Sequence, residues 1–107
     1  MVMPQYDVYV NPNPRSRESV PFVVDIQSGL IDVLRTRLTV PLSKVGVDIP
    51  GLPKRLLPQF VVEGQRLALH AHAAAGIDAR LLHDAVGSLA DHAGEIRDAL
   101  DAVVSGI

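Results

Sequence analysis

Alternating and β-branched runs predict strands over the first part of the chain. Residues 6–10, 21–26 and 37–42 either alternate polar and apolar positions or concentrate Val, Ile, Phe and Tyr, as half-buried strands do. Prolines follow the first run and remove backbone donors, so residues 11–19 are expected to form a polar loop. Pro41 is expected to place the end of the third strand at a sheet edge or a bulge, because proline cannot donate to a hydrogen-bond ladder.

The middle of the chain predicts an irregular connection followed by a hairpin. Residues 45–58 are interrupted by prolines and glycines, which disfavour regular structure. Residues 60–69 contain two apolar runs around a short polar turn, and Gly64 stands where the turn needs a positive φ. Residues 70–75 are ambiguous, since their alanines favour helix while the preceding strand favours continuation. We predict a strand there, closed by Gly76.

The clearest pattern in the sequence predicts a C-terminal amphipathic helix. Its apolar positions recur at spacings of 4, 3, 4, 3 and 4, at Leu89, Ala93, Ile96, Leu100, Val103 and Ile107. That spacing places them on one face of a helix. Ser88 is the expected N-cap, and Asp91 occupies the place of a capping-box acid. Gly94 weakens the helix by about 1 kcal/mol relative to Ala, so the helix should depend on docking to the sheet.

The end of this helix is expected to contact another protein. Asp91, Glu95, Arg97, Asp98 and Asp101 lie off the apolar stripe and should face solvent. No basic residue follows Arg97 to complement the helix dipole. The chain then ends at residues 105–107 in an exposed tail.

Composition indicates one small domain with an aliphatic core, spanning residues 1–107. Hydrophobic residues make up 48% of the chain but aromatic residues only 4%, so Val, Leu, Ile and Ala must fill the core. There is no cysteine, no apolar run of the roughly 20 residues that a membrane span needs, and no signal-peptide pattern at the N-terminus. These features favour a cytoplasmic protein without membrane contact.

The charge distribution argues against direct nucleic-acid binding. The formal net charge is −2 and the pI is about 6.0, whereas nucleic-acid binders usually carry a basic patch and a high pI. From Asp78 onward, acidic residues outnumber the basic Arg80 and Arg97. An acidic region of this kind suits a basic partner.

No local motif predicts an enzyme, a metal site or a cofactor. The histidines are His70, His72, His83 and His92. The first two could share one strand face, yet no further ligands follow at a defined spacing. Nucleophile-elbow and phosphate-loop motifs are absent from the sequence. Asp25 lies within an apolar strand, where it is either an outward-facing residue or part of a polar site that fixes a loop or a partner.

Several segments carry a family resemblance, in order along almost the whole chain: residues 6–10, 22–28, 30–32, 37–42, 57–58, 95–100 and 105–107. The most specific are Val-Asp-x-Gln-Ser at 24–28, Val-Pro-Leu at 40–42 and the terminal Gly-Ile. With them, the sequence resembles the CcdB family of bacterial toxins, which belong to toxin–antitoxin systems and poison DNA gyrase.

This resemblance implies a β-rich α+β fold: an SH3-like barrel of antiparallel strands with a small wing sheet and a docked C-terminal helix. It also implies a two-fold homodimer that is not an enzyme. Family members bind the A subunit of DNA gyrase and trap the enzyme on cleaved DNA. A cognate, CcdA-like antitoxin covers the toxin through a segment that is disordered when free.

Carried over by position, the implied gyrase-binding residues are Ser105, Gly106, Ile107, Asp101, Leu30 and Ile31. The best-known form of the family has a tryptophan where Ser105 stands, and a serine cannot supply the stacking area of that ring. Val103, Val104 and Ile107 are expected to form the dimer interface, since a small aliphatic barrel can bury surplus apolar surface there. The sequence does not identify the antitoxin contact.

Two alternative functions are compatible with the same barrel. An endoribonuclease like the MazF and Kid toxins would need a basic RNA-facing groove and an N-terminal Arg-Pro motif after a Glu-Gln pair. This sequence lacks the motif, and its nearest basic loop is Arg15 to Arg17. The other alternative is a homologue that binds its antitoxin but no longer poisons gyrase.

Overall fold

Strands dominate the computed structural model, which describes residues 3–31, 33–46 and 50–106. The strands are β1 (Asp7–Val10), β2 (Phe22–Asp25), β3 (Thr36–Lys44), β4 (Gln59–Val62), β5 (Gln65–Leu69), β6 (Ala75–Asp78) and β7 (Gly87–Ser88). Short 3-10 turns connect them: η1 (Gly29–Ile31), η2 (Lys54–Leu56), η3 (Ala71–Ala73), η4 (Ala79–Leu81) and η5 (Ala90–His92). One α-helix, α1 (Ala93–Ser105), follows the last of these turns.

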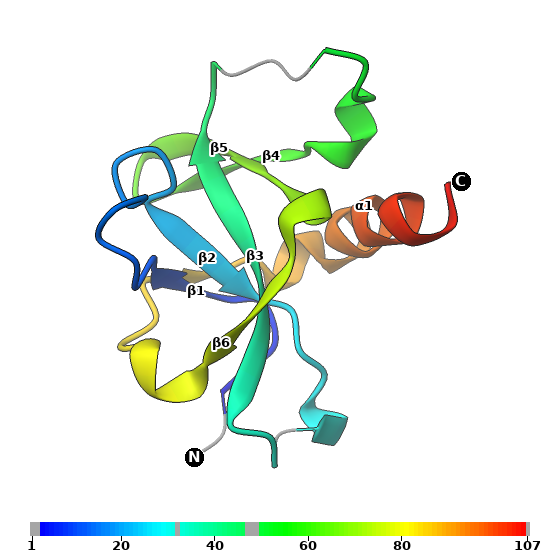
Figure 1. Cartoon of the computed structure of the whole chain (residues 1–107). Coiled ribbons are helices and arrows are strands. Elements are labelled where there is room, and N and C mark those ends of the chain that lie inside the picture. Colours follow the sequence, from blue (N-terminus) through cyan, green and yellow to red (C-terminus); the bar gives the residue numbers. More distant parts are fainter. Residues whose placement is uncertain (1–2, 32, 47–49, 107) are drawn as a thin grey trace.

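The strands form a nearly closed antiparallel barrel with one extra strand (Figure 1). Their order is β4-β5-β3-β2-β1-β7, and β6 branches off this path by pairing with β3. β3 can serve two partners because it is nine residues long: Thr36 to Thr39 pair with β6, and Leu42 to Lys44 pair with β5. The predicted β-rich barrel with a C-terminal helix is therefore confirmed.

The sequence predicted that Pro41 would place the end of the third strand at a sheet edge or a bulge. This prediction is wrong, because Pro41 lies inside β3. β3 runs through it to Lys44, and Pro41 pairs in register with Val23 of β2. On the other side of β3, the registered pairs with β6 stop at Thr39 and those with β5 begin at Leu42. The missing N–H of proline thus falls where β3 changes partners, so no ladder hydrogen bond is lost.

The strand predicted over residues 70–75 is wrong except at Ala75, where β6 begins. β5 ends at Leu69, and the chain turns through η3 before β6 begins. The His70 N–H donates to the Pro41 carbonyl at 3.0 Å, and the Ala73 N–H donates to the His70 carbonyl at 2.9 Å. These bonds redirect the chain onto the first half of β3, and the new strand continues past Gly76 to Asp78.

The predicted hairpin around Gly64 is confirmed. β4 and β5 pair directly, with Val62 opposite Gln65. The two turn residues, Glu63 and Gly64, have φ values of 51° and 75°. Two successive positive φ angles match the twist of the flanking strands, as in a type I′ turn.

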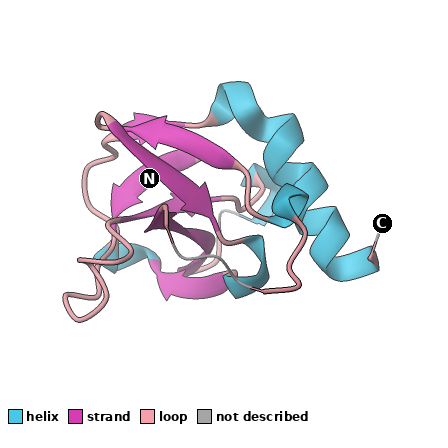
Figure 2. Ribbon diagram, turned by 90° about the horizontal axis from the view of Figure 1, so that it is seen from above, coloured by secondary structure: helices cyan, strands magenta, loops and turns pink. Residues whose placement is uncertain are grey.

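The helix covers one side of the barrel (Figure 2), contacting η2 and η3. A 3-10 turn precedes it, so the α-helix begins at Ala93 rather than after Ser88. The predicted cap at Ser88 is therefore wrong: His92 precedes the helix and makes no side-chain cap bond. The Ser88 Oγ instead accepts a hydrogen bond from the Ala90 N–H at 3.1 Å, at the start of η5. No helix in the described part of the chain is both long and apolar enough to cross a membrane.

The buried face of α1 is centred on Ile96, Ala99 and Ala102. Ile96 packs into the main core with aliphatic residues of the barrel, among them Val8, Val24, Val40, Leu42, Leu67 and Leu69. The small side chains of the two alanines allow the helix to approach the barrel closely. The apolar stripe predicted from sequence included Val103 rather than Ala102. Val103 is 39% exposed, so this part of the predicted stripe is not the buried face.

Candidate functional site

A buried ion pair lies beneath the loop that follows β2. Asp25 is 0% exposed and Arg37 is 2% exposed. The Arg37 Nε donates to Asp25 Oδ2 at 2.8 Å, and the Gln27 backbone N–H donates to Asp25 Oδ1 at 2.9 Å. Asp25 is therefore the polar site that fixes a loop, one of the two interpretations open from sequence. Sequence reasoning missed Arg37 as its partner.

Gln27 connects this ion pair to η1. Its Nε2 donates to the Ile31 carbonyl at 3.1 Å, while its Oε1 accepts the Leu38 N–H at 2.8 Å. Ser28 adds a local turn, since its Oγ accepts the Leu30 N–H at 3.1 Å. The Asp-x-Gln-Ser motif therefore anchors a loop, because each of its polar side chains hydrogen-bonds a backbone group near η1.

The loop anchored in this way presents an exposed group of large apolar side chains, which we term the apolar loop: Leu30, Ile31, Val33 and Leu34. Leu30 is 93% and Val33 is 92% exposed, while Ile31 and Leu34 are about half exposed. Exposed apolar residues that gather at one place mark contact surfaces. Sequence reasoning named the first two and missed Val33 and Leu34, although four apolar residues within five positions were the available signal.

The predicted tail residues lie at the end of α1. Asp101 is exposed, and the Ser105 hydroxyl donates to the Asp101 carbonyl at 2.6 Å. Gly106 has a φ of 72°, and its N–H donates to the Ala102 carbonyl at 3.0 Å, so it closes the helix as a left-handed cap. The Ser105 hydroxyl is thus turned back onto the helix. Ile107 lies outside the described residues.

The residues expected at a dimer interface lie on the same helix end. Val104 is 86% exposed and Val103 is 39% exposed in the single chain. Figure 1 places η1, which carries the first two residues of the apolar loop, well away from the helix end. One chain therefore does not bring the predicted gyrase-binding residues Leu30 and Ile31 beside Ser105 and Gly106.

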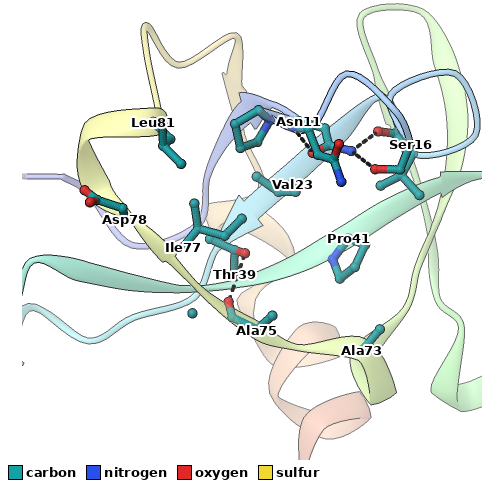
Figure 3. A pocket seen from close by; sticks show the side chains of 14 residues that line it. Asn11, Ser16, Val23, Thr39, Pro41, Ala73, Ala75, Ile77, Asp78 and Leu81 are labelled. Carbon is teal, nitrogen blue, oxygen red and sulfur yellow. Dashed lines mark hydrogen bonds between the residues drawn. The ribbon is translucent and has the colours of Figure 1, made fainter.

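A groove of about 480 Å³ opens on the outer face of the sheet, between residues 11–20 and β6 (Figure 3). One wall is braced by Asn11, whose Nδ2 donates to Ser16 Oγ at 3.0 Å and to the Val20 carbonyl at 2.8 Å. Across the floor, the Thr39 hydroxyl donates to the Ala75 carbonyl at 3.1 Å. Residues 11–19, which the sequence predicts as a polar loop, thus form a hydrogen-bonded wall of the groove.

The lining of this groove is apolar with small side chains. Val23, Pro41 and Ile77 are among its apolar lining residues, and Ala73 and Ala75 leave room for a main chain to approach. Such a surface can accept apolar side chains of an extended segment. Sequence analysis missed the groove, because its walls come from segments that are distant along the chain.

The histidines form no evident metal centre. The rings of His70 and His72 stack with centroids 5.2 Å apart, and burial, together with the neighbouring His72, lowers the pKa of His70. In the described ranges, no three His, Cys, Asp or Glu side chains gather closely enough to hold an ion.

The barrel carries a docked helix, an anchored loop with exposed apolar side chains, and an apolar groove. The family model of the CcdB protein matches residues 5–106, so the chain belongs to the CcdB family. Members of this family are toxins of toxin–antitoxin systems. A comparison with curated proteins found no match.

Proposed function

We propose that this chain poisons DNA gyrase by binding its A subunit as a homodimer and trapping the cleaved gyrase–DNA complex, without being an enzyme itself. Membership of the CcdB family supports this proposal. The observation that carries it is the apolar loop, whose Leu30 is 93% exposed although Asp25 and Arg37 hold the loop from a fully buried position. An apolar surface on a rigid support loses little conformational entropy when it binds.

In this chain, the apolar loop takes over as main anchor from the family's tail tryptophan. Ser105 offers no ring, and its hydroxyl already donates to the helix. Val33 and Leu34 extend the exposed apolar surface beyond the two positions carried over from the family, Leu30 and Ile31. A few residues near the centre of an interface contribute most of its binding energy, and in this proposal Leu30 and Val33 are among them.

The homodimer unites the two parts of this binding surface. In a single chain, the apolar loop and the end of α1 lie apart (Figure 1). A two-fold partner that packs on Val103 and Val104 can place the tail of one chain near the loop of the other. The same packing covers Val104, which is 86% exposed in one chain.

The proposal is tested with purified gyrase in supercoiling and DNA-cleavage assays. The parent protein is expected to inhibit supercoiling and to accumulate cleaved complex. Leu30→Ser should raise the concentration needed by about tenfold or more, as loss of an interface anchor does. Val61→Ser is the matched control, because Val61 is 58% exposed but lies on β4, and it should behave like the parent.

The alternatives give different results in the same experiment. Cleavage of RNA by the parent, with gyrase unaffected, would identify an endoribonuclease and overturn the proposal. Antitoxin binding without any effect on gyrase would identify a homologue that has lost poisoning.

We place the contact of the cognate antitoxin in the groove of Figure 3. The groove shares no lining residue with the apolar loop or the tail, so an antitoxin could reach it while the toxin is bound to gyrase. Its open, apolar surface suits a segment that becomes ordered on binding.

A charge in the groove tests this placement. Ala75→Glu should weaken antitoxin binding by about tenfold, measured by calorimetry, and leave gyrase poisoning intact. Ala74→Glu is the control, because Ala74 is also exposed but lies outside the lining. Equal binding by both variants would place the antitoxin elsewhere.

A further inference from the structure

A second cavity, of about 400 Å³, opens beside the start of β1. Its polar lining consists of Asp7, Tyr9, Asp84, Arg37 and Arg80. It shares no residue with the groove of Figure 3. Leu34 of the apolar loop forms part of its lining, but the polar part of the cavity has no role in the gyrase proposal.

The Tyr9 side chain lines this cavity, and its hydroxyl has no partner among the described residues. Tyr9 is 5% exposed, and its hydroxyl makes no hydrogen bond to the described residues. Within those same residues, no fully buried side-chain nitrogen or oxygen lacks a partner. The hydroxyl is therefore not sealed in the core and reaches the open space of the cavity. Burial raises the pKa of Tyr9 most, and the charges of Asp7 and Asp25 raise it further, while Arg37 lowers it by less. The phenol therefore stays protonated at neutral pH.

The basic groups of the cavity are already neutralised. Arg37 donates through Nε to Asp25 at 2.8 Å and through Nη2 to the Met3 carbonyl at 3.2 Å. The Arg80 Nη2 donates to Asp78 Oδ2 at 2.7 Å. Both guanidinium groups thus face a carboxylate of their own, and the cavity has little attraction left for an anion.

The acidic groups are not neutralised. The carboxyls of Asp7 and Asp84 make neither a hydrogen bond nor an ion pair with any residue that the structure describes. Among the described residues, Asp7 and Asp84 therefore remain as carboxylates of the lining that no guanidinium group pairs with. Burial, and then the nearby Asp25, raise the pKa of Asp7. A cation in the cavity would relieve this unfavourable environment.

We propose that this cavity binds an alkyl cation, a guanidinium or ammonium head on an aliphatic stem. The head would lie between Asp7 and Asp84 and donate to the Tyr9 oxygen. The stem would pack on Met3 and Leu82, which also line the cavity. Such a group is carried by a small diamine-like molecule or by an arginine or lysine side chain of a partner protein. The inference does not rest on the gyrase proposal.

The probes are agmatine, the capped tripeptide acetyl-Ala-Arg-Ala-amide and uncharged butylurea, each titrated into the full chain and followed by amide NMR shifts. Both cations should shift the signals of residues 7–9 and 82–85 saturably.

Asp7→Asn and Tyr9→Phe should each weaken agmatine binding, the former by about tenfold. The control Asp98→Asn, on the exposed face of α1, should bind like the parent. Asp84→Asn provides a second charge-removing variant if Asp7→Asn does not fold.

The outcomes separate the two sources of the cation. Tighter binding of the tripeptide than of agmatine supports a partner side chain, and the reverse supports a small molecule. Equal binding of butylurea and agmatine, unchanged affinity in the charge-removing variant, or saturable binding of inorganic phosphate in place of agmatine would each overturn the proposal.

Discussion

Asp25 and Arg37 show how two charged side chains can be retained inside a small aliphatic barrel. A buried ion pair contributes little net stability, because the desolvation of both ions offsets their attraction. Removing one partner is far more costly, since it leaves an unpaired charge in the core. The pair is therefore better understood as the support of the apolar loop than as a stabiliser of the barrel.

Arg37→Met is expected to lower the free energy of unfolding by roughly 3–5 kcal/mol, because it leaves the fully buried Asp25 without its charge partner. Denaturation in urea measures this change. The double variant Asp25→Leu/Arg37→Met should recover much of the loss. Arg80→Met is the control, since its ion pair with Asp78 is exposed and its loss should barely move the midpoint. An equal effect of Arg37→Met and Arg80→Met would contradict this account.

Asp7 illustrates an acid kept at a cost to stability. Its pKa is raised from the ordinary value of 3.8 by burial and by Asp25, so the folded state holds the proton more tightly than the unfolded state. Stability should therefore fall as the pH rises from 3.8 through the raised pKa, and then level off.

Asp7→Asn is expected to stabilise the protein at pH 7, because it removes this unfavourable charge. The gain should vanish below pH 3.8, where the carboxyl is protonated in both states. The urea denaturation midpoints of both proteins, measured from below pH 3.8 to pH 7, give this gain in stability. Asp98→Asn, at an exposed helix position, serves as the control. A gain in stability from Asp7→Asn that did not depend on pH would show that the gain does not come from removing the charge. Groups that weaken stability are often kept for binding, in agreement with the proposed cation site.

Among the elements, β3 contributes most to the placement of the functional surfaces. It pairs with β2 along one side and divides its other side between β6 and β5. Its Thr39 forms part of the groove, whereas its Arg37 lies under the apolar loop and lines the second cavity. Arg37 and Thr39 are two residues apart and so point to the same face of β3. One face of the strand thus supports separate surfaces at different points along its length.

The C-terminal helix is an element that local pattern predicts well and whose contacts it predicts poorly. Its existence follows from the 3.6-residue period. Its buried face uses Ala99 and Ala102, which a search for large apolar residues overlooks, since an alanine is buried only where another element comes close. Val103 and Val104 are larger but stay exposed, because no other element in the described part of the chain covers their side of the helix.

At the scale of the whole molecule, the exposed valines at the end of α1 lead to an expected oligomeric state. Sedimentation at micromolar concentration should show a dimer, because a second copy would cover Val104, now 86% exposed. Val104→Asp should shift the protein to a monomer without changing its far-UV circular dichroism. Val61→Asp, at a comparably exposed valine on β4, should leave the dimer intact. A monomeric parent would remove the basis for a binding surface shared by two chains.

The sequence by itself determined strands β1 to β5, the hairpin around Gly64 and the C-terminal helix. Each depends on residues close together along the chain: a period of two or 3.6, or a glycine at a positive φ. Family motifs added the barrel and two residues of the apolar loop. Local pattern failed over residues 70–78, because the alanine-rich segment has no strong preference and hydrogen bonds from β3 decided its path.

Only the tertiary structure decided which polar residues are buried and which surfaces are hollow. The bond between Arg37 and Asp25 spans 12 residues, and the bond between Thr39 and Ala75 spans 36. The groove and the second cavity likewise arise where distant segments meet. Burial depends on which side chains become neighbours in space, and no short-range pattern records that.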